Sequence, residues 1–180
     1  MAWTAEDIPS QEGRLALVTG ANSGLGLATI QALAARQATV ILACRSSRKA
    51  EAAQQQLQDQ GLSRLELLEL DLADLSSVQR AAESVRDRYG HLDLLINNAG
   101  VMAPPRRTTV QGHELQFGVN HLGHQALTQA LLPLMENRPD ARVVTVTSGA
   151  QYFGRIHWDD PNWEQRYERY GAYGLSLIHI

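Results

Sequence analysis

The sequence is poor in cysteine and has no long hydrophobic run, and each shortage excludes a class of protein. Cys44 is the single cysteine among 180 residues, so no disulfide can form within the chain. This fits a reducing compartment and excludes a disulfide-stapled secreted domain. No apolar stretch approaches the roughly 20 residues that a membrane helix needs. The acidic residues Glu6, Asp7 and Glu12 argue against a signal peptide. We therefore expect a cytoplasmic protein without a membrane segment.

A strong net charge is also missing. The formal net charge of −3 gives no reason to expect nucleic acid or an anionic membrane as a partner. Hydrophobic residues make up 44% of the chain and charged residues 19%, which is ordinary for a globular protein with a core. The length is typical of one domain.

Short apolar runs alternate with longer helical patterns along the chain. Because such alternation is typical of parallel sheets with right-handed crossovers, an α/β fold is expected. The run 64–70 carries Glu66 and Glu69, so we place it at a sheet edge, where charge is tolerated. The predicted strands are 14–19, 39–44, 64–70, 92–97 and 141–148, and the predicted helices are 27–37, 47–61, 75–90 and 111–135.

A glycine-rich turn, TGANSGLG, follows the first predicted strand at residues 19–26. Glycines at 20, 24 and 26 allow positive φ and let backbone N–H groups approach an anion, and the following helix N-terminus adds partial positive charge. The spacing Gly-x-x-x-Gly-x-Gly differs from Gly-x-Gly-x-x-Gly, so the turn alone leaves open an ordinary strand–helix connection. Its place at the first strand–helix junction of an α/β pattern favours a cofactor.

Five motifs in order make the sequence resemble the short-chain dehydrogenase/reductase family. They are TGANSGLG (19–26), INNAG (96–100), VNHLGH (119–124), VVTVTS (143–148) and AYGLS (172–176). The run ACR at 43–45 and the long segment between Ser148 and Tyr173 resemble the retinol-dehydrogenase-like branch. The resemblance implies a doubly wound Rossmann-type parallel sheet with strand order 3-2-1-4-5 and the C-terminal strands missing. It implies an incomplete dinucleotide-binding domain over residues 13–174, after an N-terminal extension at 1–12.

The same resemblance implies the cofactor site. Asp71 and Leu72 resemble the family's adenine-edge site, although Asp71 or Asp74 could instead cap the next helix. Asn97 is expected to brace the sheet. The implied cofactor-binding residues are Gly20, Asn22, Ser23, Gly24, Leu25, Gly26, Arg45, Asp71, Leu72, Asn98, Ala99 and Gly100.

Arg45 stands where an acidic side chain would bind the ribose hydroxyls and repel a 2′-phosphate. A guanidinium can bind a phosphate through two hydrogen bonds, so NADP(H) is favoured over NAD(H), unless Arg45 is merely a solvated loop residue. Gln37 lies where the family often has glycine, and a left-handed conformation there would be costly for a residue with a side chain.

The resemblance assigns catalysis to Ser148, Tyr173 and Asn120. Tyrosine has an ordinary pKa of about 10, so it exchanges protons near neutrality only when nearby positive charge lowers that pKa. In the family this charge is a lysine four residues after the tyrosine, on the same helix face. The serine positions the substrate oxygen, and the asparagine holds a water of the proton relay. Taken singly, the three could be a turn serine, a core aromatic and a buried helix polar residue.

Other residues near these motifs have less specific interpretations. His121 and His124 lie one turn apart without an evident third ligand, so we expect packing or surface histidines and no metal. Tyr152, Phe153 and Trp158 are candidates either for the substrate pocket or for the core.

The family's lysine is missing, because position 177 is Leu177. Either the protein is a natural variant that binds cofactor without catalysis, or the sequence is a truncated copy in which residues 175–180 are a non-native tail; we expect the second. The implied function is an NAD(P)-dependent oxidoreductase that interconverts a small-molecule carbonyl and an alcohol, and an oligomer is compatible with it. The alternatives are a non-catalytic dinucleotide-binding or scaffold module and a reductase of a larger pigment-like or isoprenoid substrate.

Overall fold

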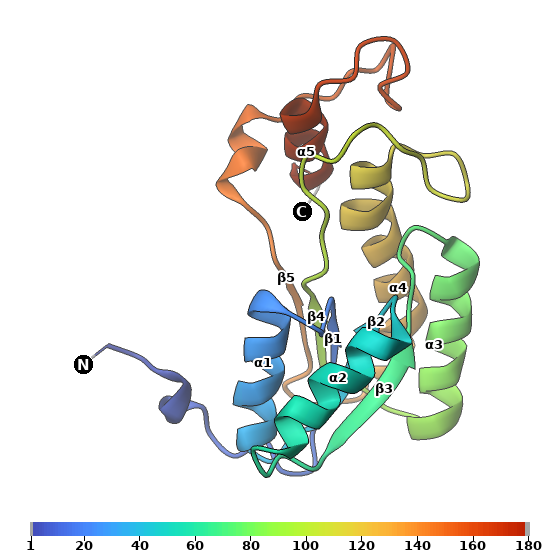
Figure 1. Cartoon of the computed structure of the whole chain (residues 1–180). Helices are drawn as coiled ribbons and strands as arrows, with labels where there is room; N and C mark the ends of the chain where they lie inside the picture. Colours follow the sequence, from blue (N-terminus) through green and yellow to red (C-terminus); the bar gives the residue numbers. More distant parts are fainter. Residues whose placement is uncertain (1, 179–180) are drawn as a thin grey trace.

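The fold is built on one parallel sheet, seen in a computed structural model that describes residues 2–178 (Figure 1). The strands are β1 (Leu15–Thr19), β2 (Thr39–Cys44), β3 (Leu65–Glu69), β4 (Leu94–Asn97) and β5 (Arg142–Thr145). Their order is β3-β2-β1-β4-β5, and every neighbouring pair is parallel. The predicted fold class and strand order are confirmed, and β3 is the edge strand that its glutamates predicted.

Helices cover both faces of the sheet (Figure 1). They are α1 (Gly24–Ala35), α2 (Ser47–Gln58), α3 (Leu75–Tyr89), α4 (His124–Leu131) and α5 (Arg169–Leu177). The short elements are η1 (Ala5–Asp7), η2 (Phe117–Gly123), η3 (Leu132–Leu134) and η4 (Gly149–Phe153). No helix within residues 2–178 is long and apolar enough to cross a membrane.

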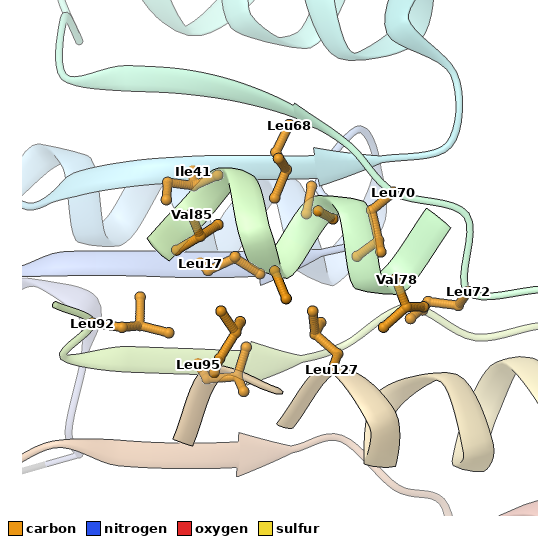
Figure 2. Packing of buried hydrophobic residues seen from close by; sticks show 14 of the residues in the cluster. Leu17, Ile41, Leu68, Leu70, Leu72, Val78, Val85, Leu92, Leu95 and Leu127 are labelled. Atoms are coloured by element: carbon orange, nitrogen blue, oxygen red, sulfur yellow. The ribbon is translucent and has the colours of Figure 1, made fainter. Parts of the chain in front are cut away.

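Adjacent strand residues supply two separate cores, because successive side chains of a strand point to opposite faces. Leu17 of β1 packs with Val85 of α3 and Leu127 of α4, in the cluster drawn in Figure 2. The next residue, Val18, packs on the other face with Ile30 of α1. Both β1 side chains are fully buried. This is why the central strands β1 and β2 are apolar along nearly their whole length, and why the fold is doubly wound.

The predicted helix 111–135 is wrong at its start and in its regularity. Residues 108 and 114 instead form an antiparallel bridge, and Gly112 has a φ of +85° that a helix does not allow. Helical structure begins at residue 115 and passes through the π-helical η2 before α4. The predicted strand 141–148 is also shorter, although Val146 N–H still donates to the Asn97 carbonyl at 2.9 Å after β5 ends.

The predicted strain at Gln37 is present. Gln37 follows α1 with a φ of +74°, in the left-handed region where glycine is favoured. Its N–H donates to the Ala34 carbonyl at 2.9 Å, so the chain turns sharply into β2 at this point.

Candidate dinucleotide and catalytic site

The turn after β1 requires glycine for conformation and for space. Gly20 has a φ of +65° and Gly24 a φ of +54°. A Cβ on Gly20 would lie 2.9 Å from Ala99 Cα, and one on Gly26 would collide with the Gly20 carbonyl oxygen. The turn is therefore packed directly on the loop after β4, and side chains at these positions would separate the two.

The N-terminus of α1 is open at this turn. Ser23 is its N-cap residue and makes no side-chain capping bond within the described chain. Ser23, Gly24 and Leu25 are all exposed. First-turn amides without a capping side chain can donate to an anion, and the helix dipole favours negative charge there.

A pocket at the carboxyl ends of β1, β2 and β3 collects most of the predicted dinucleotide residues. Gly20, Asn22, Arg45, Asp71, Leu72, Ala99 and Gly100 line it. Sequence reasoning missed its other lining residues, which are Thr19, Ala43, Cys44, Leu70, Val101, Leu115 and Val119. Those at strand ends could have been found from the strand predictions, whereas Leu115 and Val119 come from a distant helix. Ser23, Gly24, Leu25, Gly26 and Asn98 lie outside this lining, in the turn or in the loop behind it.

The end of β2 carries an exposed arginine beside a buried thiol. Arg45 is exposed and lines the pocket, so its guanidinium can reach a ligand there. Burial raises the pKa of the Cys44 thiol, so a neutral group lies beside the arginine; the backbone of Ala21 and Asn22 opposes that shift.

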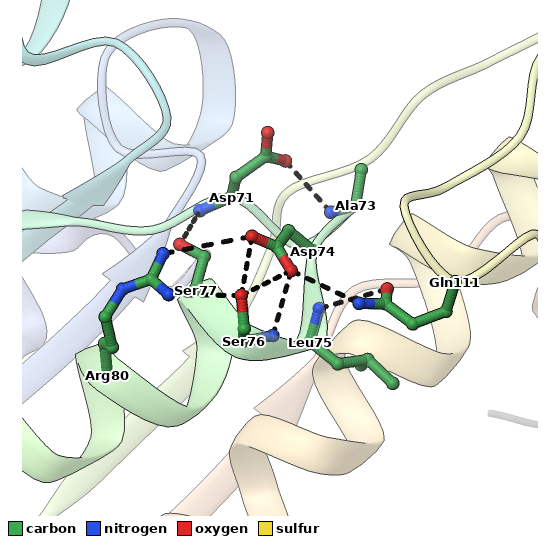
Figure 3. A network of polar contacts seen from close by, with 8 residues as sticks. All are labelled: Asp71, Ala73, Asp74, Leu75, Ser76, Ser77, Arg80 and Gln111. Carbon is green, nitrogen blue, oxygen red and sulfur yellow. Dashed lines mark hydrogen bonds and ion pairs between the residues drawn. The ribbon is translucent and has the colours of Figure 1, made fainter.

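The two aspartates after β3 have separate roles (Figure 3). Asp74 is the N-cap of α3 and accepts from Ser76 N–H at 3.0 Å and from its hydroxyl at 2.8 Å. Asp71 accepts from Ala73 N–H at 2.9 Å through Oδ1, and its carboxylate lies at the pocket lining. Capping is therefore performed by Asp74, whereas Asp71 lines the pocket and its adenine-edge role stays a prediction.

The loop after β4 is fastened to the end of β1 by a short set of hydrogen bonds. Asn98 N–H and Ala99 N–H both donate to Thr19 Oγ1 at 2.9 Å. Asn98 Nδ2 donates to the Thr19 carbonyl at 2.8 Å. Asn97 Nδ2 donates to Thr128 Oγ1 at 3.0 Å, which ties β4 to α4 as a bracing residue should. Within the described chain, the buried Asn97 Oδ1 has no hydrogen-bond partner.

A second pocket places two of the three predicted catalytic residues, Asn120 and Tyr173, beside this loop. Its lining comprises Asn98, Ala99, Gly100, Val101, Met102, Asn120, Val146, Thr147, Tyr173 and Leu177. Ala99, Gly100 and Val101 line both pockets. The two pockets therefore share a wall, and a dinucleotide in the first would extend along it toward Tyr173 and Asn120.

Asn120 is a buried brace in the π-helical segment η2. Its Oδ1 accepts from Val101 N–H at 2.8 Å, and its Nδ2 donates to the Val101 carbonyl at 3.0 Å and to Ser176 Oγ at 2.9 Å. Ser176 Oγ in turn donates to the Tyr173 carbonyl at 2.7 Å. The asparagine side chain therefore holds the loop after β4 and the tyrosine helix α5 together. The water that the resemblance assigns to Asn120 stays a prediction.

Ser148 lies next to the tyrosine helix, outside the lining of the pocket that contains Tyr173. Its Oγ accepts from Ala150 N–H at 3.3 Å and caps η4. The element η4 packs closely on α5, since a Cβ on Gly174 would lie 2.9 Å from the Ala150 carbonyl oxygen.

The aromatic residues after Ser148 are not part of the core. Tyr152, Phe153 and Trp158 are 83%, 84% and 84% exposed. The core alternative is wrong for all three, because the segment carries them outward from η4 and the loop after it.

A buried polar cluster that the sequence did not suggest positions the start of α5. Gln116 Nε2 donates to the Arg169 carbonyl at 2.9 Å and to Tyr167 Oη at 3.1 Å, and its Oε1 accepts from Ala103 N–H at 2.8 Å. Glu114 and Gln116 are both fully buried. A sequence pattern could not indicate this, because Tyr167 and Arg169 lie more than 50 residues from Gln116.

The two histidines of VNHLGH differ in burial. His121 is half-buried and stacks on Phe117, with ring centroids 5.4 Å apart. His124 is buried, and desolvation lowers its pKa from 6.5 to about 4, so it is neutral near pH 7. Residues 2–178 contain no group of three or more histidine, cysteine, aspartate or glutamate side chains able to hold a metal.

The chain matches the family model described as short chain dehydrogenase over residues 14–159. It is 42% identical over 170 residues to human retinol dehydrogenase 13, covering 93% of this chain and 51% of that protein. It is 41% identical over 180 residues to human retinol dehydrogenase 14, covering 92% of this chain and 54% of that protein. The chain thus spans about half the length of the curated relatives it matches.

Solved structures show the same likeness. An uncharacterised protein from Mycobacterium paratuberculosis is 49% identical, with a TM-score of 0.87 over 99% of this chain and 62% of that one. An NADP complex of RhlG from Pseudomonas aeruginosa is 28% identical and has a TM-score of 0.72. The match covers 94% of this chain and 63% of that chain. From the sequence match, the strand order and the glycine turn together, the chain belongs to the short-chain dehydrogenase family.

Proposed function

We propose that this chain binds NADP(H) and serves an oxidoreductase that interconverts a carbonyl and an alcohol by hydride transfer. The observation that carries the proposal is the wall of Ala99, Gly100 and Val101, which joins the strand-end pocket to the pocket of Tyr173 and Asn120. A dinucleotide in the first pocket would have its reactive end beside a hydroxyl that can exchange a proton.

The residues present fit the cofactor. The glycine turn leaves no space for a Cβ at residue 26 and presents an uncapped helix N-terminus, which suits a diphosphate. Arg45 at the pocket lining suits a 2′-phosphate and favours NADP(H) over NAD(H). Matched structures include complexes with NADP and with NAD, so the preference rests on Arg45.

In this mechanism the bound nicotinamide supplies or accepts the hydride. Tyr173 Oη donates a proton to the oxygen of the carbonyl being reduced, and it takes the proton back in the reverse direction. Ser148 Oγ orients that oxygen by donating its hydroxyl proton, which its bond from Ala150 N–H leaves available. Asn120 keeps the tyrosine helix at a fixed distance from the cofactor loop through Val101 and Ser176.

The substrate we propose is an apolar alcohol or aldehyde. Val101, Met102 and Val146 line the pocket of Tyr173, so apolar surface faces the reacting group. Several curated relatives are named retinol dehydrogenases, and retinol is an alcohol of this chemical class.

A second function, a dinucleotide-binding module without catalysis, is favoured by one observation. Leu177 stands four residues after Tyr173, lines the same pocket and is buried, so an uncharged side chain fills the place of the family's lysine. This arrangement keeps the cofactor pocket and removes the ammonium that supports proton transfer.

The test measures binding and turnover separately. NADPH and NADH are titrated against the protein by intrinsic fluorescence, and NADPH consumption is then followed with retinal and a panel of other aldehydes and ketones. Turnover is measured in a chain that is continued to the length of its relatives and carries Leu177→Lys, because the 180-residue chain is expected to be inactive. NADPH binding with turnover in that continued chain supports the enzyme, and NADPH binding without turnover in it supports the module. Absence of NADPH binding would refute both. The cytoplasmic location stays a prediction, and cell fractionation tests it.

A further inference from the structure

His124 connects two parts of the site that come from opposite sides of the sheet's carboxyl end. Its Nε2 lies 2.9 Å from Thr19 Oγ1 at the end of β1, and its Nδ1 lies 3.0 Å from the Asn120 carbonyl oxygen in η2. The ring is 4% exposed, so water does not compete for these contacts.

The chemistry of the partners fixes where the protons are. A carbonyl oxygen only accepts, so Nδ1 carries the proton and donates to Asn120. The ring is neutral, so Nε2 is an acceptor and takes the hydroxyl proton of Thr19. The Ile96 carbonyl is a more distant acceptor for that hydroxyl, at 3.4 Å. Both lone pairs of Thr19 Oγ1 are then directed to Asn98 N–H and Ala99 N–H.

We propose that His124 is a positioning residue that orients the Thr19 hydroxyl and thereby couples the cofactor loop at Asn98–Ala99 to the catalytic helix segment at Asn120. The proposal rests on the proposed function, because it names what holds the shared wall of the two pockets in place. If His124 donated to Thr19 instead, the hydroxyl oxygen would face three donors with two lone pairs, and one loop amide would lose its partner. The loop would then be free to move away from the glycine turn, on which Ala99 packs.

The first experiment reads the tautomer without any cofactor. The ¹⁵N chemical shifts of the His124 ring are measured in the full chain, and the Thr19→Val variant identifies the contact. The Nδ1–H neutral tautomer is expected from pH 6 to pH 8, with the Nε2 shift moving in Thr19→Val. An Nε2–H tautomer, a protonated ring at pH 7, or an Nε2 shift that ignores Thr19→Val would overturn the proposal.

The second experiment measures NADPH affinity in variants that a spectrum shows to be folded. His124→Phe keeps the ring shape and removes both hydrogen bonds, and it should weaken NADPH binding about 10-fold, which corresponds to about 1.4 kcal/mol. Thr19→Val should do the same. The double variant should lose about 10-fold in NADPH affinity rather than 100-fold, because the two residues act through one contact.

The controls separate positioning from general damage. His121→Phe makes the same change one turn away and should leave NADPH affinity within about 2-fold. Thr19→Ser keeps the hydroxyl and should restore affinity to within about 3-fold of the parent. Full affinity in folded His124→Phe, or additive losses in the double variant, would refute the coupling. If the parent chain itself binds no NADPH, the proposed function fails, whereas the tautomer experiment still decides the hydrogen-bond arrangement.

Discussion

Tyr173 and Leu177 lie four residues apart on α5 and line one pocket with Asn120. Tyr173 is half-buried and Leu177 is 4% exposed, so the position of the family's lysine is filled by packed hydrocarbon. A leucine cannot stabilise a tyrosinate or hydrogen-bond a ribose, and this contact therefore determines what the chain can be expected to catalyse.

We expect the 180-residue chain to have no appreciable dehydrogenase activity. A chain carrying Leu177→Lys and continued to the length of its relatives should turn over at least about 10²-fold faster, since a supported acid–base group contributes 10²–10⁴-fold. The continued chain that retains leucine at 177 is the matched control. Rates of NADPH consumption with aldehydes measure the difference. Equal rates for all three proteins would contradict the prediction.

In that lysine-bearing, continued chain, Tyr173→Phe should abolish turnover and change NADPH affinity by less than about 2-fold. The substitution removes a proton donor and leaves the ring and the phosphate contacts in place. Fluorescence titration gives the affinity, and single-turnover kinetics give the rate. A phenylalanine variant that still reduces aldehydes would disprove the role of Tyr173.

Arg45→Ala should weaken NADPH binding by about 1.5–3 kcal/mol and leave NADH binding nearly unchanged. The physical reason is the loss of a charge-assisted hydrogen bond to the 2′-phosphate, which NADH lacks. Arg48→Ala, also exposed and three residues away, is the control and should change both affinities little. If Arg45→Ala weakens the binding of NADPH and NADH equally, Arg45 does not bind the 2′-phosphate.

The stability of the fold should fall as the pH is lowered through the range from 6.5 to 4. The pKa of His124 is about 4 in the folded chain, against an ordinary 6.5. Between these pH values the unfolded state therefore binds a proton that the folded state does not bind. Desolvation is the main cause of the lowered pKa, and a smaller contribution comes from the electrostatic influence of the neighbouring His121. The loss amounts to roughly 3 kcal/mol and is complete below about pH 4.

Urea unfolding at pH 7 and pH 4.5 measures this loss. The variant His124→Gln, which cannot titrate, should show a smaller decrease between the two values. The pKa of Asp93 is also lowered, since hydrogen bonds from Arg138 and Leu15 N–H outweigh its desolvation, but that carboxylate acts at still lower pH. Identical pH dependence in the parent and His124→Gln would argue against a buried neutral histidine.

Gly26→Ala should destabilise the chain by about 1–3 kcal/mol, the usual cost of overpacking. A Cβ at residue 26 would collide with the Gly20 carbonyl oxygen and lie 2.7 Å from Asn98 Nδ2. Gly149→Ala is the matched control, because a Cβ there meets nothing within 4 Å. Thermal unfolding compares the two. A Gly26→Ala protein as stable as the control would show that the turn relaxes freely.

Much of the fold was predictable because it depends on local patterns. Short apolar runs alternating with helical patterns indicated the five strands, and Glu66 and Glu69 placed β3 at the edge. Gly90 ends α3 as a C-cap glycine does, at a φ of +68°. These features depend on residues that are close together along the chain, so the sequence alone predicts them.

The helix 111–135 shows where local pattern fails. Its apolar spacing extends over the turn at Gly112, where the N–H of Thr109 bonds to the carbonyl of His113 at 2.8 Å instead of continuing a helix. The π-helical turn at Asn120 is also invisible in the pattern, since it is held by Val101 and Ser176, residues 19 and 56 positions away. Long-range hydrogen bonds decided both.

The sequence by itself determined the strands, the glycine turn, the arginine after β2 and the absence of lysine at 177, because each is a matter of residue type and near neighbours. Only the tertiary structure decided that Asp74 rather than Asp71 caps α3 and that Tyr152, Phe153 and Trp158 face outward. It alone made His124 a neutral link between Thr19 and Asn120. The physical reason is that burial and hydrogen-bond partners depend on which distant segments meet, and a periodicity along the chain does not contain that information.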